Sequence, residues 1–199
     1  MSYFFFKRVF DLLFSVLVIV FVLSWVLPLM ALLIKLDSPG PVFFFQKRIG
    51  KGGRPFICIK MRTMVVNPQA DQLPAGREDG RVTRLGKWLR CTYLDELPQF
   101  FNVLLGSMSL VGPRPYMLTD NQVFSRIVAD HPMRYTIRPG ITGMAQIKGL
   151  HGPLSERDGT VIVTRFQWDI FYIRNANFLL DIDIIRRSIH LLFTQQMRA

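Results

Sequence analysis

The sequence lacks charge over a long stretch near its start: from Leu12 to Ile34 it contains no Asp, Glu, Lys or Arg. A run of roughly 20 apolar residues is long enough for a membrane helix, and a domain of this size seldom buries a helix that is apolar on every face. A secretory signal is excluded because the run is too long and is followed by IKLDSPGPVFF rather than a small-residue cleavage site. We therefore expect residues 1–36 to form a retained membrane anchor.

The path of this anchor through the membrane has two possible forms. Pro28 removes one backbone hydrogen bond inside the apolar run, with Ser24 one turn earlier, so we expect a bend there. Basic residues flank both ends of the run: Lys7, Arg8, Lys35, Lys47 and Arg48. Positively charged flanks stay on the cytoplasmic side, so a helix that enters the membrane and re-emerges on the same face satisfies both observations. A straight span with an incidental kink is the alternative.

Cysteine and histidine are scarce, and this limits the metal and redox chemistry. The two cysteines, Cys58 and Cys91, form no C-x-x-C pair, so neither a zinc site nor a disulfide framework is indicated. The three histidines lie at no ligand spacing to one another: His131, His151 and His190. A reduced domain that faces the cytosol is consistent with this composition.

Acidic residues are also few, 14 against 25 Lys and Arg, which leaves a formal net charge of +11. Such an excess implies an anionic partner, and membrane phospholipid, nucleic acid and phosphorylated metabolites are the candidates. The anchor makes phospholipid the default partner, since basic segments beside a membrane bind anionic headgroups. Nucleic-acid binding is not expected, because the chain carries no recognised motif for it.

Residues 43–64, FFFQKRIGKGGRPFICIKMRTM, are typical of a strand, a glycine turn and a second strand. The GKGG at 50–53 is not a phosphate-binding loop, which requires G-x-x-x-x-G-K-[ST] between a strand and a helix. Side chains alternate along a strand, so Lys60 and Arg62 share one face with Cys58. The polar segment 67–80 predicts a surface loop.

The rest of the chain predicts mainly helices. We expect them at about 95–105, ending at Gly106, at 116–135, and in FLLDIDIIRRSIHLLF at 178–193. The last helix is amphipathic, and Asp183 lies four residues before Arg187, the favourable order for an ion pair. Packing against the core is favoured slightly over lying on the membrane surface. Its apolar stripe is Ile182, Ile185, Ile189 and Leu192.

Asp95 and Glu96 stand just before Pro98, a residue that is tolerated in the first turn of a helix. At that position the helix dipole is expected to keep a carboxylate ionised. A purely structural interpretation is a helix cap, because Asp is a common N-cap worth about 1 kcal/mol.

The surplus of basic residues around this pair favours chemistry over capping. Two acids do not require so many cations, whereas an anionic ligand would. One carboxylate could attack phosphorus while the other holds Mg²⁺. The candidate anion-binding residues are Lys60, Arg62, Arg84, Arg90, Arg114 and Arg138; prolines flank Arg114, and a Pro-Gly corner follows Arg138.

RVTRLGKWLR, LDELPQFFNVLLGSMSLVGPRP and RPGITGMAQ, in this order, closely resemble the bacterial sugar transferase family. These are the monotopic phosphoglycosyl transferases, which include undecaprenyl-phosphate glycosyl-1-phosphate transferases. The resemblance runs from KRVFD at 7–11 to DIFYIRN at 169–175. It implies a ping-pong transfer of a sugar-1-phosphate from a UDP-sugar to undecaprenyl phosphate, which releases UMP and initiates glycoconjugate assembly.

The resemblance also assigns roles by position. It implies that Asp95 is the nucleophile that carries a covalent phosphosugar, and that Glu96 binds Mg²⁺. Lys60, Arg114 and Asp169 match family positions linked to phosphate binding or catalysis. Our electrostatic argument adds Arg90, Arg138, Arg84 and Arg62 as substrate-binding residues.

Two segments depart from the family pattern. Many relatives break the re-entrant helix at Ser-Pro, but here Trp25 follows Ser24 and the proline comes at 28, so we expect the break a turn deeper. Residues 151–166 lack features that some smaller members share, so we expect sugar choice to vary there.

The predicted fold is α+β. A re-entrant membrane anchor at 1–36 precedes a cytosolic catalytic domain at 37–199 that contains a β-hairpin and interfacial amphipathic helices. The resemblance places it at the bacterial inner membrane, facing the cytoplasm, as a minimal catalytic unit. A membrane-anchored anion-binding module without catalysis is the alternative. The sugar, the pathway and the oligomeric state stay open.

Overall fold

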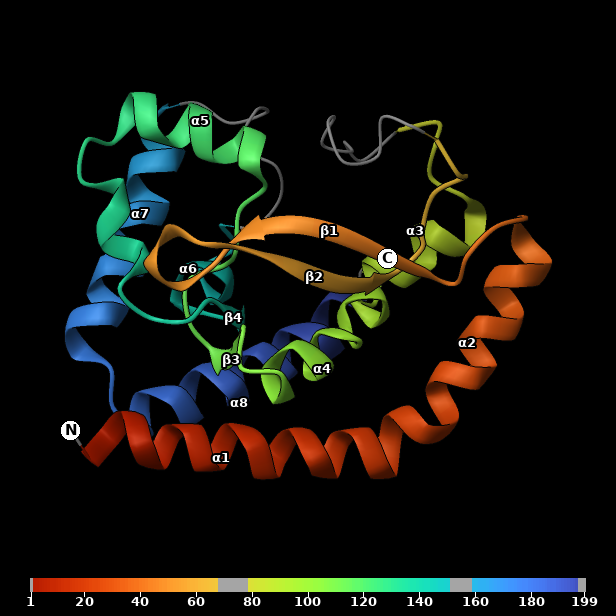
Figure 1. The fold of residues 1–199 in the computed structure, drawn as a ribbon, viewed down its shortest axis with the longest axis horizontal. Coiled ribbons are helices and arrows are strands. Elements are labelled where there is room, and N and C mark those ends of the chain that lie inside the picture. The colour runs from red at the N-terminus through yellow and green to blue at the C-terminus, as the bar shows by residue number, and fades with distance from the viewer. Residues whose placement is uncertain (1, 68–78, 151–158, 197–199) are drawn as a thin grey trace.

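The structure is a computed structural model that describes residues 2–67, 79–150 and 159–196. It is a mixed α and β fold with a long apolar helix at the N-terminus, as predicted (Figure 1). Most of the surface loop predicted at 67–80, and half of the segment 151–166, lie outside the described residues.

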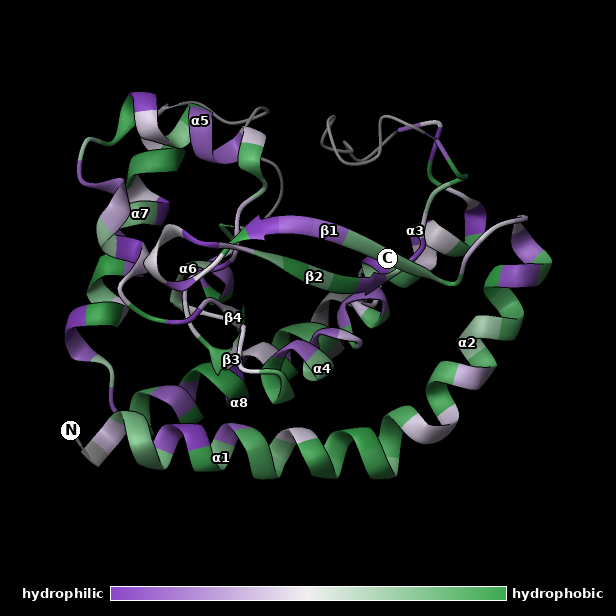
Figure 2. Cartoon of the chain, viewed as in Figure 1, coloured by the Kyte–Doolittle hydropathy of each residue, from purple (hydrophilic) through white to green (hydrophobic). Residues whose placement is uncertain are grey.

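The N-terminal helix consists of α1 (Ser2–Val18), a π-helical turn (Ile19–Leu23) and α2 (Ser24–Asp37). Residues Tyr3–Asp37 are long and apolar enough to cross a membrane by length and composition, and only 17% of the most apolar window is buried. Figure 2 shows hydrophobic residues along most of both helices. This exposure differs from that of a core helix, which hides its apolar surface inside the protein.

The helix bends where α1 meets α2, and α2 does not continue the direction of α1 (Figure 1). The irregular turn lies at Ile19–Leu23, before Ser24, rather than a turn deeper at Pro28 as we expected. There the Ser24 amide donates to Ile19 O, which is the wider i→i−5 spacing, and the Ser24 hydroxyl donates to Val20 O at 2.7 Å. A π-turn is a recognised cause of a kink, so the distortion is located one turn upstream of the proline.

The predicted hairpin is confirmed. Strands β1 (Phe43–Ile49) and β2 (Pro55–Met61) pair antiparallel, with Phe43 opposite Met61 and Ile49 opposite Pro55. The turn is a 3₁₀ segment, Lys51–Gly53, in which Gly52 and Gly53 have φ values of +70° and +73°. Glycine adopts such values without steric penalty, which explains the GKGG sequence.

A second sheet was not predicted from the sequence. Strands β3 (Ser109–Val111) and β4 (Gly140–Thr142) are only three residues each and pair in parallel. A Cβ at Gly140 would lie 2.1 Å from the Gly112 amide nitrogen, so only glycine allows the two segments to approach this closely. This sheet brings the VGPRP segment beside the RPGIT segment.

The remaining helices surround these two sheets. The segment predicted as one helix at 116–135 is divided into α5 (Leu118–Ile127) and a 3₁₀ turn (His131–Tyr135). The helix predicted at 95–105 is likewise divided into a 3₁₀ turn (Leu94–Glu96) and α4 (Gln99–Leu104). The other helices are α3 (Arg84–Cys91), α6 (Met144–Ile147), α7 (Gly159–Asn175) and α8 (Phe178–Gln196).

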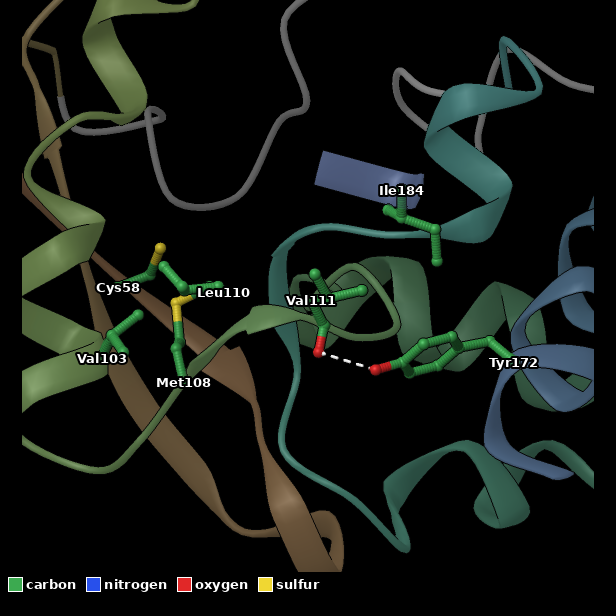
Figure 3. Packing of buried hydrophobic residues seen from close by; sticks show 7 residues of the cluster. All are labelled: Cys58, Val103, Met108, Leu110, Val111, Tyr172 and Ile184. Atoms are coloured by element: carbon green, nitrogen blue, oxygen red, sulfur yellow. Dashed lines mark hydrogen bonds between the residues drawn. The ribbon is translucent and has the colours of Figure 1, made fainter. Parts of the chain in front are cut away.

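The main core lies where β2, α4, β3, α7 and α8 meet. Figure 3 shows its buried residues: Cys58, Val103, Met108, Leu110, Val111, Tyr172 and Ile184. The Tyr172 hydroxyl donates to Val111 O at 3.3 Å, so the polar end of the largest side chain is bonded inside the core. Because Cys58 belongs to this core, the face of β2 that carries it points inward, and Lys60 lies on the same face.

A buried polar network joins α1 to the last helix. Lys7 Nζ lies 2.8 Å from Asp181 Oδ2, and the Tyr3 hydroxyl donates to the same oxygen at 2.8 Å. Tyr172 donates to Asp181 Oδ1 at 2.6 Å. The contacts of Tyr3 and Lys7 with Asp181 span more than 170 residues of sequence and connect the two ends of the described chain.

Candidate active site

Asp95 and Glu96 lie in the 3₁₀ turn Leu94–Glu96, one turn before α4. Tyr93, immediately upstream, has a φ of +57°, an uncommon value for a residue other than glycine. Neither the 3₁₀ turn nor α4 has a side-chain cap. The interpretation of Asp95 as a helix cap is therefore wrong, and both carboxylates are buried, each with about 8% of its residue surface exposed.

Two cations hold the carboxylate of Glu96. Lys60 Nζ donates to Oε1 at 2.7 Å, and Arg114 donates to Oε1 at 2.6 Å and to Oε2 at 3.2 Å. Burial alone would raise the pKa of Glu96, but Arg114 and Lys60 outweigh it and hold that pKa well below its usual value. Glu96 is therefore a permanently ionised, fixed carboxylate.

Asp95 is in the opposite situation. Its carboxylate makes no hydrogen bond or ion pair with any residue that the structure describes. Burial raises its pKa from 3.8 to about 6; Lys60 acts against this rise, and the adjacent charge of Glu96 adds to it. The expectation that Asp95 is ionised at neutral pH stays a prediction, and a pKa of about 6 is compatible with it. At pH 7 a group with this pKa is mostly ionised, and among the described residues Lys60, Arg90 and Arg114 act on it through their charge rather than through a hydrogen bond.

Lys60 precedes Glu96 in the sequence and Arg114 follows it, and both side chains contact its carboxylate. Lys60 lies on the inward face of β2, as the alternation of side chains along the strand predicted. Arg114 lies between Pro113 and Pro115, and its backbone is held as well: Arg134 donates to Arg114 O at 3.1 Å, and Arg48 donates to Pro115 O at 2.6 Å. These bonds fix the peptide that presents the Arg114 guanidinium.

Arg90, near the end of α3, lies close enough to Asp95 that their charges interact. Its Nε donates to the Thr63 hydroxyl at 2.8 Å. A Cβ at Gly86 would lie 1.9 Å from Thr63 O, so α3 can pack against the end of the hairpin only because residue 86 is glycine. Lys60, Arg90 and Arg114 are therefore the predicted basic residues that the fold brings to the Asp95–Glu96 pair.

The other predicted site residues are elsewhere. Arg62 is buried and donates to Ser38 O and Pro39 O, at 2.6 and 2.5 Å, beyond the end of α2. Arg138 donates to Gly106 O at 2.7 Å, just after α4, and Arg84 is exposed at the start of α3. The structure brings none of these three into contact with Glu96.

Asp169 is linked to Glu96 indirectly, through Arg134 and Arg114. It is buried on α7 and accepts from Arg134 at 2.6 and 3.1 Å. Burial raises the pKa of Asp169, and Arg134 partly offsets that rise. Arg134 in turn lies over the Tyr116 ring, 3.8 Å from its centroid, and bonds to Arg114 O. Asp169 thus supports the backbone that carries Arg114.

Arg134 and Arg48 were missed by sequence reasoning. Both lie in segments assigned to secondary structure on pattern alone, and each contacts the VGPRP segment through a backbone carbonyl. No short-range pattern marks such contacts. The two prolines around Arg114 were the available signal, because proline has no N–H and interrupts a helix or a strand ladder, so the carbonyls of such a segment need donors from elsewhere.

The site fits a Mg²⁺ ion that is shared with a substrate. Within the described residues no group of three or more His, Cys, Asp or Glu could form a metal cage. Mg²⁺, however, is commonly bound by one or two carboxylates together with substrate phosphates. Asp95 offers a carboxylate with no bond to a described residue, and Glu96 Oε2 accepts only the longer bond from Arg114. These carboxylate oxygens would suit a Mg²⁺ ion that also binds the phosphates of a substrate.

A groove of about 330 Å³ opens beside this cluster. Glu96, Arg114 and Tyr93 line it together with residues of α1 and α8. The cluster therefore lies next to an apolar cavity bounded by the membrane-length helix.

A buried pair of carboxylates with basic residues around it, beside a helix long and apolar enough to cross a membrane, is an arrangement suited to binding a phosphate. The sequence model of the bacterial sugar transferase family matches residues 2–195. The chain belongs to this family.

Named relatives make the comparison more specific. A UDP-glucose:undecaprenyl-phosphate glucose-1-phosphate transferase of Klebsiella pneumoniae is 41% identical over 181 residues, which cover 90% of this chain and 38% of that protein. A UDP-N-acetylgalactosamine-undecaprenyl-phosphate N-acetylgalactosaminephosphotransferase of Aeromonas hydrophila is 42% identical over 193 residues, 96% of this chain and 44% of that protein. The chain thus spans less than half the length of these two relatives.

A third relative is similar in length. The exopolysaccharide production protein PSS of Rhizobium leguminosarum bv. phaseoli is 41% identical over 184 residues, which cover 90% of each chain.

Proposed function

We propose that this chain transfers a sugar-1-phosphate from a UDP-sugar to undecaprenyl phosphate, giving undecaprenyl-diphosphate-sugar and UMP. The observation that carries the proposal is the contrast within the acidic pair. Glu96 is held by Lys60 and Arg114, whereas the buried Asp95 carboxylate has no bond to any described residue. A weakly solvated carboxylate without a partner is suited to act as a nucleophile. The names of the relatives support the donor and acceptor classes.

In the first step an Asp95 oxygen attacks the phosphorus that bears the sugar. The bond from that phosphorus to the UMP oxygen breaks, and UMP leaves with the electron pair. Arg114, Lys60 and Arg90 surround the position where phosphate charge develops, and fixed cations stabilise such charge without reorganising. The product is an acyl phosphate, in which the phosphosugar is bonded to the Asp95 carboxylate.

In the second step a phosphate oxygen of undecaprenyl phosphate attacks the same phosphorus. The acyl phosphate bond to Asp95 breaks, the diphosphate link forms, and the Asp95 carboxylate is regenerated. The donor's UMP and the acceptor's phosphate can therefore use the same basic residues in turn, which is the ping-pong order.

Glu96, together with the substrate phosphates, would hold Mg²⁺ in this scheme. A bound Mg²⁺ neutralises phosphate oxygens and so lowers the barrier to attack by an anion. Lys60 and Arg114 fix the orientation of Glu96, so the carboxylate is already in place before a substrate arrives.

The membrane arrangement is part of the proposal. Residues 1–36 form a re-entrant anchor that bends at the π-turn and returns to the cytoplasmic face of a bacterial inner membrane, and residues 37–199 form the catalytic domain on that face. Two observations support it: basic residues at both ends of the apolar run, and the bend between α1 and α2. Anionic phospholipid is the expected surface partner. The product would begin the assembly of a bacterial glycoconjugate.

A panel of UDP-sugars tests the function and identifies the donor. Purified protein with Mg²⁺ is incubated with each UDP-sugar and undecaprenyl phosphate, and UMP is measured. We expect UMP from at least one donor, and no UMP from any member of a broad panel would contradict the proposal. Binding of a UDP-sugar without UMP release would instead support the membrane-anchored anion-binding module.

A trapping experiment tests the nucleophile. A donor labelled in the sugar phosphate is added without acceptor, and the protein is isolated after denaturation. The label should remain on the wild-type chain and on the surface variant Asp183→Asn, and should be absent from Asp95→Asn. Label on Asp95→Asn would exclude Asp95 as the attacking group.

A further inference from the structure

The groove beside the acidic pair has walls from both ends of the chain. Phe14 and Val18 of α1 form one side, and α8 forms the other. The contribution of α8 is Ile185, Ser188, Ile189, Leu191 and Leu192, so most of the stripe predicted from the sequence faces this cavity. Residues of β3, β4 and α6 complete the lining: Leu110, Ile141, Thr142, Gln146 and Ile147.

The charge in the lining is confined to one end. Among the described residues that line the groove, only Glu96 and Arg114 are charged. Elsewhere the lining is largely apolar, and its uncharged polar side chains are those of Tyr93, Thr142, Gln146 and Ser188. The hydroxyls of Thr142 and Ser188 bond to each other at 2.6 Å, and Gln146 Nε2 donates to Ile141 O at 2.9 Å. A ligand that matches this pattern has one anionic group at its end and a long hydrocarbon body.

The groove is continuous with the membrane-length helix. Phe14 and Val18 belong to the charge-free run 12–34, and the neighbouring Leu13 and Leu17 are 62% and 53% exposed. One edge of the groove is therefore formed by a helix whose outer surface suits lipid. A hydrocarbon chain could pass from a bilayer into the groove without crossing a polar surface.

The apolar lining begins directly at the charged pair. Leu97 follows Glu96 in the chain, and Phe100 lies one turn further on, and both line the groove. This favours a ligand whose phosphate is attached directly to hydrocarbon. A polyprenyl phosphate has that structure, whereas a phospholipid places a glycerol and two polar esters between its phosphate and its chains.

We propose that this groove holds the phosphate-proximal part of the polyprenyl chain of the acceptor, with its phosphate at Arg114 beside Asp95. This inference rests on the proposed function, since it gives the second substrate of that reaction a place. It also explains why α1 and α8 are tied together by the Lys7–Asp181 pair: that pair fixes the two walls relative to each other.

Variants that fill the groove test the inference. Val18→Trp and Ile189→Trp each add volume to one wall, and Leu179→Trp adds the same volume to the face of α8 that is 81% exposed and outside the groove. Each protein is assayed in two ways. Exchange of labelled UMP into the UDP-sugar reports the first step alone, and transfer at varied undecaprenyl phosphate reports the second.

We expect both groove variants to raise the KM for undecaprenyl phosphate by about tenfold or more, with UMP exchange within about twofold of wild type. Leu179→Trp should change neither quantity. Exchange also reports folding, because a misfolded variant would lose it. Absence of exchange in the wild type would overturn the proposed function, whereas normal exchange with an unchanged acceptor KM would overturn the groove assignment.

A photo-crosslinking experiment identifies the occupant. A polyprenyl phosphate with a diazirine on its second isoprene unit should label peptides from α1 and α8. Excess undecaprenyl phosphate should abolish the labelling, and phosphatidic acid in mixed micelles should not. Equal competition by phosphatidic acid would show that the groove holds phospholipid, and labelling confined to other helices would also contradict the assignment.

Discussion

Asp95 and Glu96 are adjacent in the chain, yet their carboxylates meet opposite electrostatic conditions. Lys60 and Arg114 bind Glu96 directly and lower its pKa, while burial raises that of Asp95 to about 6. Two adjacent carboxyl groups whose pKa values are driven apart are a recognised mark of divided roles. At this scale the site consists of one carboxylate that two cations bind and one that makes no hydrogen bond or ion pair with a described residue.

Asp95→Asn should abolish transfer and raise stability. The pKa rises from 3.8 to about 6, and each tenfold change in proton affinity is worth about 1.4 kcal/mol, so holding Asp95 ionised in the folded protein costs up to about 3 kcal/mol. The destabilisation develops as the pH rises from the unfolded pKa of 3.8 to the folded pKa of about 6, and it is complete above the second value. Thermal unfolding should show a higher Tm for Asp95→Asn at pH 7.5 and little difference near pH 4. A lower Tm at pH 7.5 would mean that the carboxylate supports the fold.

The rate of the first step should follow the ionisation of Asp95. Only the carboxylate form attacks, so the release of UMP in a single turnover should be nearly constant above pH 7 and fall about tenfold per pH unit below pH 6. The pH profile of this release checks the prediction, because the donor diphosphate keeps its charge over this range, whereas exchange would also follow the second ionisation of UMP at about pH 6. A midpoint near pH 4 would indicate that Asp95 is better solvated than its burial implies.

At the scale of elements, two basic residues near the end of the hairpin make their contacts in two different parts of the molecule. Lys60 lies on β2 and reaches Glu96, whereas Arg62, two residues on, binds the carbonyls after α2. Charged donors on the carbonyls at a helix C-terminus are favourable. Arg62 therefore joins the N-terminal apolar helix to the hairpin that carries Lys60.

Arg62→Met should weaken the fold rather than substrate binding. Loss of the charged hydrogen bonds to Ser38 O and Pro39 O should reduce the free energy of unfolding by about 2–3 kcal/mol. The donor KM, measured well below the Tm, should stay within about twofold of wild type. Arg84→Met, at an exposed position, is the control and should change neither. A large rise in donor KM with an unchanged Tm would restore Arg62 to the substrate site.

At the scale of the whole molecule, the first and last helices close the structure around the site. Lys7, Tyr3 and Tyr172 all bond to the buried Asp181 carboxylate. Asp11, on the same helix as Lys7, accepts from the Ser109 hydroxyl on β3 at 2.7 Å. The apolar helix is thus bound to the core by polar contacts at its N-terminal end and carries no charge from Leu12 to Ile34.

Asp181→Asn should weaken the attachment of α1 to α8 and lower the stability of the protein. Breaking a buried ion pair costs about 3–5 kcal/mol, and Lys7 would keep only its longer contact with Asp11, at 3.8 Å. Asp183→Asn, two residues away in an exposed pair with Arg187, should leave the Tm unchanged. Thermal unfolding and limited proteolysis of the two variants in parallel measure the difference, and equal behaviour would contradict a structural role for the buried network.

The sequence by itself determined what depends on local pattern. The charge-free run predicted the long apolar helix, alternation placed Lys60 on the inner face of β2, and the four-residue spacing predicted the Asp183–Arg187 pair, which the structure confirms at 2.7 Å. The quoted motifs predicted the family, which the comparison confirms. Periodicity and spacing carry this information because each involves residues within a turn or two of one another.

Only the tertiary structure decided which basic residues surround the acidic pair. Lys60 and Arg114 reach Glu96 across 36 and 18 residues of sequence, whereas Arg62 and Arg138 bind backbone carbonyls and Asp169 binds Arg134. The raised pKa of Asp95 likewise depends on burial by segments far apart in the chain. Net charge indicated that an anion binds. The place where it binds follows from packing, because the partner and the solvation of each charge are set by contacts that no local pattern encodes.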